Sequence, residues 1–297
     1  MSKIGIVTVL YNSGKVLEEF FQTLEEQTFK DFQLYVIDNA STDNSLALCE
    51  EYAQKVSFQT KIYAEKENWG VAKGNNIGII NALADRCEYV LLSNNDIVLN
   101  PNTIQSLYDG MLQMKATMAV PKIYFHDTGR IWCAGGKFSK YKGVTYQIGY
   151  NKADDIKYND PKKVEYAPTC FMLISTSVFM RIGLMDESYF VYYDDTDFVW
   201  RSVKRHKESL VYIPYSILHH KESSCTGGTR SHFALYYLNR NSVYFCKKNM
   251  RGVQRIISLL YLYLHTSFRK PRFYSNEEMA IIKRARKDAI KLFYNDI

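Results

Sequence analysis

The first hundred residues alternate between short apolar runs and longer stretches with apolar residues at helical spacing. The apolar runs, which predict strands, are IGIVTVLY, FQLYVID, KIYAEK and EYVLLSN. Between them lie three predicted helices, SGKVLEEFFQTLEEQ, STDNSLALCEEYAQK and GVAKGNNIGIINALA, with Ser13 capping the first and Ser41 or Asp43 the second. Strands separated by helices of this length form an α/β fold with a mostly parallel, doubly wound sheet.

Polar residues follow four predicted strands at the points where the strands end. They are Tyr11-Asn12, Asp38-Asn39, Asn68 and Asn94-Asn95-Asp96. Any one of these groups has the composition of an ordinary loop. Because the carboxyl ends of parallel strands meet at one edge of a sheet, the four groups together predict a ligand site there, with the loop interpretation left open.

The remaining chain divides by pattern and charge. Residues 100–232 are less regular, and residues 233–297 are helical and basic, with a predicted break around Lys270-Pro271. The net charge is +9 over residues 233–297 and −2 over the rest of the chain. We therefore expect one α/β domain over 1–232, in the halves 1–99 and 100–232, followed by a basic helical region.

The basic region contains the run IISLLYLYL, with basic residues on both sides of it. This pattern suits a helix that lies on an anionic membrane surface through residues 251–272. Packing on the same domain or on another subunit explains it equally well, so a homo-oligomer is left open. The run is too short to span a bilayer, and no basic-aromatic groove accompanies it, so nucleic acid is not an expected partner.

The six cysteines show no CxxC pair, which favours a reducing compartment and argues against a structural zinc site. The chain begins directly on a strand-like run, KIGIVTVLY, without a signal peptide. We therefore expect a cytoplasmic protein, in contact with the inner face of the plasma membrane if the basic region binds there.

Phosphate cannot be bound by a glycine-rich loop after the first strand, because the chain reads YNSGKV there. Asp96, at a strand end, offers a carboxylate that can hold Mg²⁺ or Mn²⁺ between two phosphates, with Asn94 as a neutral helper. The pair His219-His220 also follows a predicted strand. A histidine pair in a surface loop usually has no function, but one of these rings would complete a metal site with Asp96.

Asp194, Asp195 and Asp197 place three carboxylates within four residues at the predicted start of a helix. Capping of the helix explains such a cluster. Crowded carboxylates also raise one another's pKa values and can produce a general base, so both interpretations stay open.

Seven segments carry these motifs in order. They are IVTVLYNSGKVLEEFFQTLEEQTF, LYVIDNASTDNS, ENWGVAKGNNIGI, YVLLSNNDIVL, GLMDESYFVYYDDTDFVWR, YIPYSILHHKESS and YLNRNSVYF. Together they resemble the family 2 inverting glycosyltransferases with the GT-A fold, and most of all the bacterial rhamnosyltransferase and galactofuranosyltransferase branch. The resemblance covers about residues 3–250.

The resemblance implies that the strand ends bind a nucleotide diphosphate sugar. Thr8 and Tyr11 match residues that contact the base, and Asp38 and Asn39 match residues that bond the pyrimidine edge. The other implied nucleotide-binding residues are Asn68, Gly70, Lys73, Asn76, Asn94 and Asn95.

The resemblance also implies a metal-dependent single displacement. Asp96 would bind Mn²⁺ or Mg²⁺, with His219 supporting the metal and His220 as the second choice. Asp195, or else Asp194, would accept the proton of the acceptor hydroxyl as it attacks and inverts the anomeric carbon. The acidic residues near 96 and near 195 should then face one cleft.

Three positions depart from the family pattern. Asn94 stands where the first Asp of a DxD motif is common, which leaves the metal site one charge short. Asp194 stands where Glu is common, and Thr169 stands where Gly is common, beside the acceptor region.

The implied donor is dTDP-rhamnose, followed by a UDP-hexose or UDP-galactofuranose. The implied acceptor is a hydroxyl of a growing bacterial surface polysaccharide or a lipid-linked saccharide, bound by the catalytic half 100–232, with 1–99 as the nucleotide-binding half. Two alternatives remain. One is a catalytically weak or dead nucleotide-sugar-binding protein, and the other is a sugar-1-phosphate nucleotidyltransferase, whose expected Gly- and Arg-containing loop is missing from YNSGKVLEE.

Overall fold

The computed structural model describes residues 2–221 and 231–295, and the side chains of these residues except 266–272 and 295. The longer strands are β1 (Ile4–Leu10), β2 (Phe32–Asp38), β3 (Thr60–Ala64), β4 (Tyr89–Ser93), β6 (Met118–Phe125), β11 (Phe171–Ser175) and β12 (Leu210–His220). The shorter strands are β5 (Ile97–Leu99), β7 (Ile131–Cys133), β8 (Gly136–Phe138), β9 (Thr145–Gln147) and β10 (Lys162–Lys163). The α-helices are α1 (Gly14–Glu25), α2 (Ser45–Ala53), α3 (Gly70–Ala84), α4 (Thr103–Gln113), α5 (Thr176–Ile182), α6 (Asp194–Val199), α7 (His232–Asn249), α8 (Gly252–Phe273) and α9 (Asn276–Asn295).

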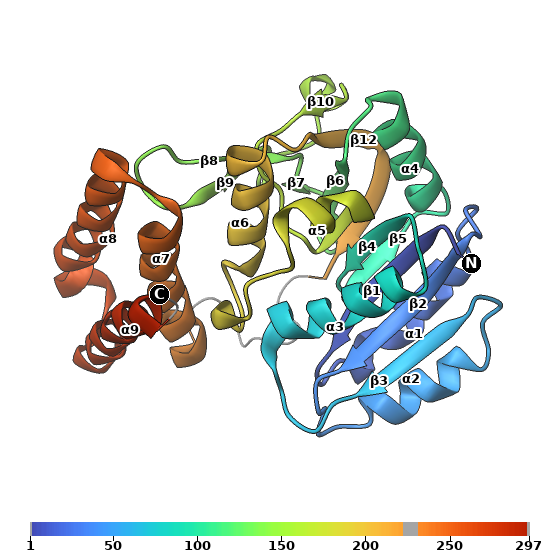
Figure 1. The fold of residues 1–297 in the computed structure, drawn as a ribbon, viewed down its shortest axis with the longest axis horizontal. Coiled ribbons are helices and arrows are strands. Elements are labelled where there is room, and N and C mark those ends of the chain that lie inside the picture. Colours follow the sequence, from blue (N-terminus) through green and yellow to red (C-terminus); the bar gives the residue numbers. More distant parts are fainter. Residues whose placement is uncertain (1, 222–230, 296–297) are drawn as a thin grey trace.

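One mixed sheet runs through the molecule in the order β10-β12-β6-β11-β4-β1-β2-β3, with β5 beside β12 and β7 beside β6 (Figure 1). Strands β4, β1, β2 and β3 run parallel to one another, and β12 is parallel to β6. Strand β11 is antiparallel to both β4 and β6. The predicted mostly parallel, doubly wound sheet with a helical C-terminal extension is confirmed.

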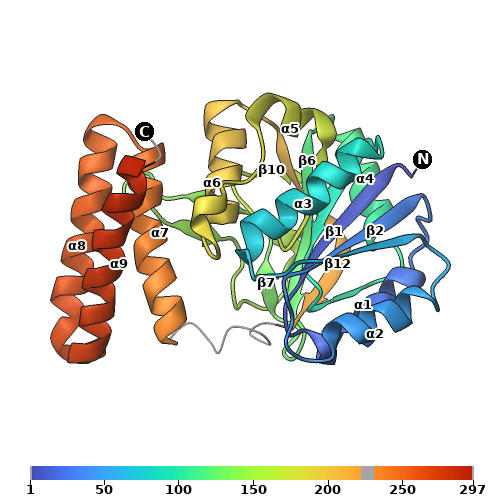
Figure 2. The same ribbon diagram turned by 60° about the horizontal axis from the view of Figure 1, so that its bottom comes forward.

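Strands β1 and β2 are buried along almost their whole length, as expected for parallel strands covered on both faces. Helices α1 and α2 cover one face of this part of the sheet, and α3 covers the other (Figure 2). Helix α3 lies very close to β1, because a Cβ atom at Gly74 would stand 2.8 Å from the Val9 side chain and one at Gly78 would stand 2.3 Å from that of Val7. The glycines of GVAKGNNIG therefore set the distance between helix and sheet.

Strand β12 carries His219 and His220 at its end. It runs parallel to β6 and, at its end, antiparallel to β5, with His220 opposite Ile97. An irregularity in the pairing with β6 falls between Ile213 and Ile217. The end of β12 is thereby placed directly beside the turn that follows β4.

The C-terminal helices α7, α8 and α9 lie together at one end of the molecule (Figures 1 and 2). Helix α7 contributes to the main hydrophobic core through Val243, Tyr244, Phe245 and Cys246. The predicted break around Lys270-Pro271 is wrong, because α8 continues to Phe273 and α9 begins at Asn276. Within the described part of the chain, no helix is long and apolar enough to cross a bilayer.

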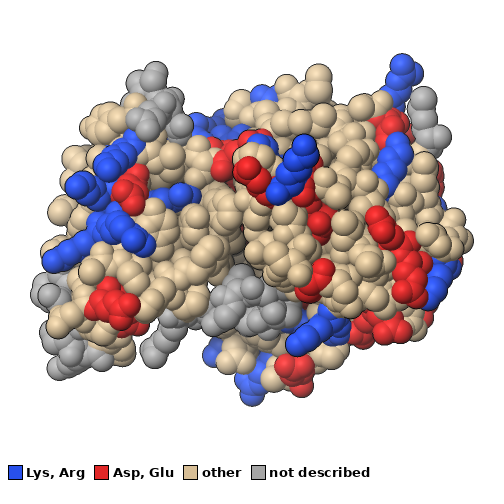
Figure 3. All heavy atoms as spheres, turned by 90° about the horizontal axis from the view of Figure 1, so that it is seen from below, with Lys and Arg blue, Asp and Glu red and all other residues tan. Residues whose placement is uncertain are grey.

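Basic side chains gather over the C-terminal helices, on the left of Figure 3. Those of α9 include Lys283, Arg284, Lys287 and Lys291, which are all exposed. The charge asymmetry seen in the sequence is therefore also an asymmetry of the surface.

Candidate active site

The ends of β1 and β2 present buried polar atoms that the protein leaves without partners. Among the described residues, Oγ1 of Thr8, Oδ1 of Asp38 and Oδ1 of Asn39 are buried and make no hydrogen bond. The other carboxylate oxygen of Asp38 accepts only a long bond of 3.3 Å from the Ser41 backbone. A buried polar atom without a partner costs about 1–3 kcal/mol, so these atoms mark a place where a polar ligand would be stabilised.

The turn before α3 lies next to this group. The side chain of Asn68 accepts a 2.9 Å hydrogen bond from the Gly70 backbone, and the Gly70 carbonyl accepts one of 2.9 Å from the amide of Asn39. The ammonium of Lys73 lies 3.3 Å from the centre of the Trp69 ring. The three predicted residues Asn68, Gly70 and Asn39 are thus brought together.

Asn76 and Asn95 are both engaged within the protein. The amide of Asn76 donates 2.9 Å and 3.0 Å bonds to the Met185 carbonyl and the Glu187 carboxylate, and accepts one of 3.0 Å from the Met185 N–H. The amide of Asn95 donates a 2.9 Å bond to the Val9 carbonyl. Both side chains link chain segments, whereas Tyr11 and Asn94 are exposed to solvent.

Asp96 has a histidine beside it. Nε2 of His220 lies 3.2 Å from Oδ1 of Asp96, and the backbone N–H of Lys221 donates to the Asp96 carbonyl at 2.8 Å. His220 is buried, with the ring of Trp132 centred 4.7 Å from its own. The Nε1 atom of Trp132 and the Nδ1 atom of His220 make no hydrogen bond to any described residue.

His219, the first choice from the sequence, points elsewhere. Neighbouring residues of a strand project to opposite faces, so only one histidine of the pair can face Asp96. The ring of His219 stacks on Tyr124 at 5.6 Å, and burial lowers its pKa. The structure thus places His220, and not His219, beside Asp96. No group of three or more His, Cys, Asp and Glu side chains placed to hold a metal occurs within residues 2–221 and 231–295.

Asp194 and Asp195 open α6 and lie in a poorly hydrated environment. Burial, and then the charge of Asp195, raises the pKa of Asp194 to about 8. Burial also raises the pKa of Asp195, and a 2.5 Å hydrogen bond from the Tyr166 hydroxyl opposes this rise. The second oxygen of Asp195 accepts a 2.6 Å hydrogen bond from the backbone N–H of Thr196, so both oxygens of this carboxylate are engaged.

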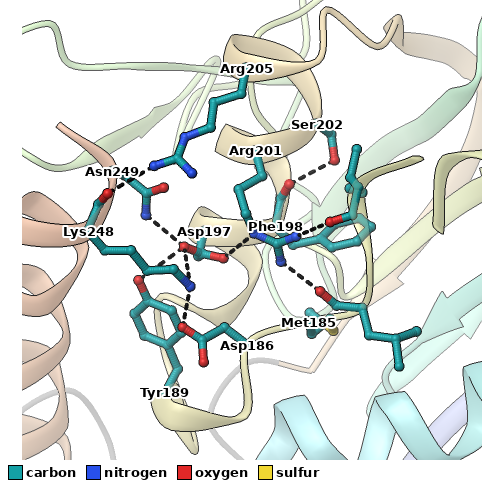
Figure 4. A network of polar contacts seen from close by, with 12 residues as sticks. Met185, Asp186, Tyr189, Asp197, Phe198, Arg201, Ser202, Arg205, Lys248 and Asn249 are labelled. Carbon is teal, nitrogen blue, oxygen red and sulfur yellow. Dashed lines mark hydrogen bonds and ion pairs between the residues drawn. The ribbon is translucent and has the colours of Figure 1, made fainter. Parts of the chain in front are cut away.

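Asp197 has a different role from its two neighbours. It is fully buried and lies at the centre of the polar contacts in Figure 4. Its carboxylate is 2.6 Å from Nε of Arg201 and accepts a 2.7 Å hydrogen bond from Asn249 at the end of α7. These contacts satisfy the carboxylate, so Asp197 joins α6 to α7.

Residues 166–170 contact both acidic groups. The Tyr166 hydroxyl donates a 2.5 Å hydrogen bond to the carboxylate of Asp195. The Cys170 carbonyl also accepts a 2.7 Å bond from the Asn94 backbone. One short segment therefore joins Asp195 to the turn that contains Asp96.

Two candidate residues were not found from the sequence. Tyr166 and Trp132 both lie in residues 100–232, the less regular part of the sequence. Neither residue has a local motif. The only available signal was the general suitability of aromatic side chains for binding sugars.

Comparison with known proteins identifies a family. Residues 5–183 match the family described as Glycosyl transferase family 2. The glycosyltransferase GlyG of Streptococcus pneumoniae is 25% identical over 183 residues, which are 60% of this chain and 58% of GlyG. This chain therefore spans less than two thirds of the length of GlyG.

Two further proteins are similar over more of their length. The N-acetylglucosaminyl-diphospho-decaprenol L-rhamnosyltransferase of Mycobacterium tuberculosis is 24% identical over 253 residues, which are 79% of this chain and 81% of that protein. The crystal structure of S. aureus TarS 1–349 in complex with UDP-GlcNAc aligns with a TM-score of 0.64 and 17% identity over 99% of this chain and 82% of TarS. This likeness confirms the predicted GT-A type fold.

Proposed function

The chain belongs to glycosyl transferase family 2, and we propose that it transfers a sugar from a nucleotide diphosphate sugar to a saccharide hydroxyl with inversion. One observation carries the proposal: residues 166–170 contact the pair of carboxylates with raised pKa values through Tyr166, and they contact the turn of the Asp96–His220 pair through the Cys170 carbonyl. The Asp96–His220 pair suits a diphosphate held with a cation, and the pair of carboxylates suits an acceptor hydroxyl.

The nucleotide is assigned to the ends of β1 and β2. Asp38 and Asn39 offer buried oxygens that would accept the N–H of a pyrimidine, and Thr8 offers a hydroxyl. Tyr11, Asn68, Gly70, Lys73 and Asn94 follow strand ends or open α3 and are proposed to complete this site, while Asn76 and Asn95 hold the surrounding segments. The M. tuberculosis relative is named as a rhamnosyltransferase and TarS binds UDP-GlcNAc, so dTDP-rhamnose and UDP-sugars are the donors proposed here.

The residues at Asp96 fit a bound Mn²⁺ or Mg²⁺ ion. A carboxylate oxygen and an imidazole nitrogen lie 3.2 Å apart at a strand end. Hard cations that bind nucleotide phosphates commonly use only one or two protein ligands, so Asp96 and His220 are sufficient in number even with Asn94 in place of a second carboxylate. Such an ion would supply positive charge next to the leaving diphosphate.

Asp195 is the proposed base. The pKa of Asp194 near 8 keeps that group protonated at neutral pH, so the closely spaced pair holds one proton. Asp195 is then the carboxylate, with its two oxygens oriented by Tyr166 and Thr196. It would take the proton of the acceptor hydroxyl as the new glycosidic bond forms and the bond to the nucleotide diphosphate breaks.

The acceptor is proposed to be a surface polysaccharide or a lipid-linked saccharide, with the protein on the inner face of the plasma membrane. Helix α8 supports this, because it exposes apolar side chains three or four residues apart: Val253, Ile256, Leu260 and Leu264. The part of the predicted membrane contact at residues 266–272 lies outside the described side chains.

The membrane contact can be tested by sedimentation with lipid vesicles. The protein should sediment with phosphatidylglycerol vesicles but not with phosphatidylcholine vesicles. Ile256→Glu should abolish this binding, and Ile156→Glu, at an exposed side chain outside α8, should keep it.

The test of the function is a donor panel of dTDP-rhamnose, UDP-GlcNAc, UDP-galactose and UDP-galactofuranose with Mn²⁺. The wild-type protein should release nucleotide diphosphate from one of them, and Asp195→Asn should reduce that rate about 10²- to 10⁴-fold. Asp160→Asn, at an exposed carboxylate, is the matched control and should leave the rate unchanged.

Equal rates in wild type and Asp195→Asn would favour a nucleotide-sugar-binding protein without activity. Formation of a nucleotide sugar from a sugar 1-phosphate and a nucleoside triphosphate would favour a nucleotidyltransferase instead.

A further inference from the structure

The segment that leads into the two acids has an unusual backbone. Phe190, Tyr192 and Tyr193 have φ angles of 64°, 61° and 66°, and none of them is glycine. Residues with a side chain adopt such angles rarely, and they persist where the surrounding structure holds them. We call residues 188–195 the acid segment, and the contacts that hold it decide where Asp194 and Asp195 lie.

Asn241 of α7 supplies three of these contacts. Its side-chain amide lies 2.9 Å from the carbonyl of Tyr189, 2.8 Å from that of Val191 and 2.8 Å from that of Tyr192. Asn241 has no exposed surface, so its two amide hydrogens are shared among these three carbonyls rather than with water. The Asn241 side chain alone thus bonds to three backbone carbonyls of the acid segment.

Arg240 adds to the same arrangement. One of its guanidinium nitrogens donates 2.7 Å hydrogen bonds to the carbonyls of Ser188 and Tyr189. Its Nε atom donates a 2.8 Å bond to the side-chain oxygen of Asn241. Arg240 therefore fixes the orientation of the Asn241 amide, with the nitrogen toward the acid segment.

The opposite side of the acid segment touches the start of α3, beside the ends of β1 and β2, which we call the nucleotide edge. The carbonyl of Phe190 accepts a 2.6 Å hydrogen bond from the backbone N–H of Val71. A Cβ atom at Gly70 would stand 2.3 Å from the same carbonyl oxygen. The segment is therefore held between α7 and the start of α3.

We propose that Asn241 and Arg240 are positioning residues, which hold the acid segment so that Asp195 reaches the acceptor hydroxyl. The inference rests on the proposed function, because it assigns these residues a part in that reaction. Helix α7 is attached to the domain independently, through apolar core residues and through the bond from Asn249 to Asp197. Loss of the Asn241 amide should therefore loosen the acid segment and leave α7 in place.

The experiment uses the full chain with Asn241→Ala and with the matched control Asn239→Ala. Asn239 is on the same helix, and among the described residues its side chain bonds only to the Leu235 carbonyl, one turn away. Hydrogen exchange in peptides covering 186–197 should be faster in Asn241→Ala and unchanged in Asn239→Ala. Because a displacement of about 1 Å costs about 100-fold in rate, kcat for the best donor of the panel should fall by about that factor. KM and the Kd for UDP should stay within about threefold, since Thr8, Asp38 and Asn39 are not touched.

Arg240 provides the second pair of variants, which decides the question if Asn241→Ala does not fold. Arg240→Met should repeat the loss of kcat, and Arg240→Lys, which keeps a donor, should restore most of it. The proposal is overturned if exchange over 186–197 is unchanged, or if kcat and UDP affinity fall together. A wild-type protein without activity on any donor would reject the proposed function, while the exchange measurement would still decide whether Asn241 holds the segment.

Discussion

The candidate site has two parts, the nucleotide edge at the ends of β1 and β2 and the acid segment of residues 188–195, and they are built in different ways. At the nucleotide edge, the sheet itself places the residues, because Leu10 pairs with Asp38 in the register of β1 and β2. The acids instead follow a loop with three unusual φ angles, which residues some fifty positions further along the chain hold in place. The nucleotide edge is thus a local product of the strands, and the acid segment depends on distant contacts.

The two halves also differ in what they leave unsatisfied. Thr8, Asp38 and Asn39 each have a buried oxygen without a partner among the described residues, so a ligand is needed to satisfy them. Asp195 already accepts hydrogen bonds from Tyr166 and Thr196. Substitutions at the nucleotide edge should therefore change binding, and substitutions around the acids should change turnover.

The largest effect is expected from Asp96→Ala. Removal of the one carboxylate at the cation site should lower turnover about 10³-fold, or about 4 kcal/mol, and abolish the increase in UDP affinity on adding Mn²⁺. Calorimetric titration with UDP, with and without Mn²⁺, measures the second effect. The exposed Asp127 provides the control, Asp127→Ala. If Mn²⁺ raises UDP affinity equally in Asp96→Ala and wild type, the cation does not bind at Asp96.

Gly70→Ala tests the contact between the halves. Its φ of +79° disfavours a side chain, and the added Cβ atom would also meet the Phe190 carbonyl. The backbone alone should cost about 1–3 kcal/mol of unfolding free energy, and both UDP affinity and turnover should fall. Gly129→Ala is the matched control, since Gly129 has a φ of +63° but nothing within 4 Å of its added Cβ. If both variants lose the same stability and activity, the contact with Phe190 is unimportant.

Tyr166→Phe should change the pH dependence of turnover and not the affinity for UDP. The Tyr166 hydrogen bond lowers the pKa of Asp195, so its loss raises that pKa. A base must be deprotonated to act, so the acidic limb of the profile should move to higher pH, with a loss of about tenfold below it and recovery above it. Measurement of kcat against pH in both proteins shows the shift. A limb that stays in place would mean that Asp195 is not the group that titrates.

The smallest effect is expected from His219→Ala, because this ring lies on Tyr124 and away from Asp96. Turnover should stay within about twofold of wild type, whereas His220→Ala should lower it about 10- to 100-fold, because it removes one of the two proposed ligands of the cation. The opposite order would restore the assignment made from the sequence.

Much of the nucleotide edge could be predicted because local pattern decides it. The predicted third helix coincides with α3 (Gly70–Ala84). The second helix begins later than predicted, at Ser45, and the reason is not local. The side chain of Asn12 accepts hydrogen bonds from the backbone N–H groups of Thr42 and Asp43, which holds these residues in a turn.

The order of the two histidines could not be predicted for a related reason. In a regular strand, alternation would show which side chain faces Asp96. The pairing of β12 is irregular between Ile213 and Ile217, so the faces of its last residues cannot be counted from its start. The roles of Tyr166 and Asn241 could not be predicted either, because these residues contact Asp195 and the acid segment through tertiary contacts that leave no periodic pattern in the sequence.

The packing of α7 in the main core limits which segments of such proteins can be exchanged between relatives to make chimaeras. The family match ends at residue 183, before Asp195, His220 and the helix that holds the acid segment. A fragment cut at that position would expose the partners of Val243, Tyr244 and Phe245 and would lack the proposed base. A chimaera must therefore take the chain at least through α7 as one unit, which is longer than the matched residues 5–183.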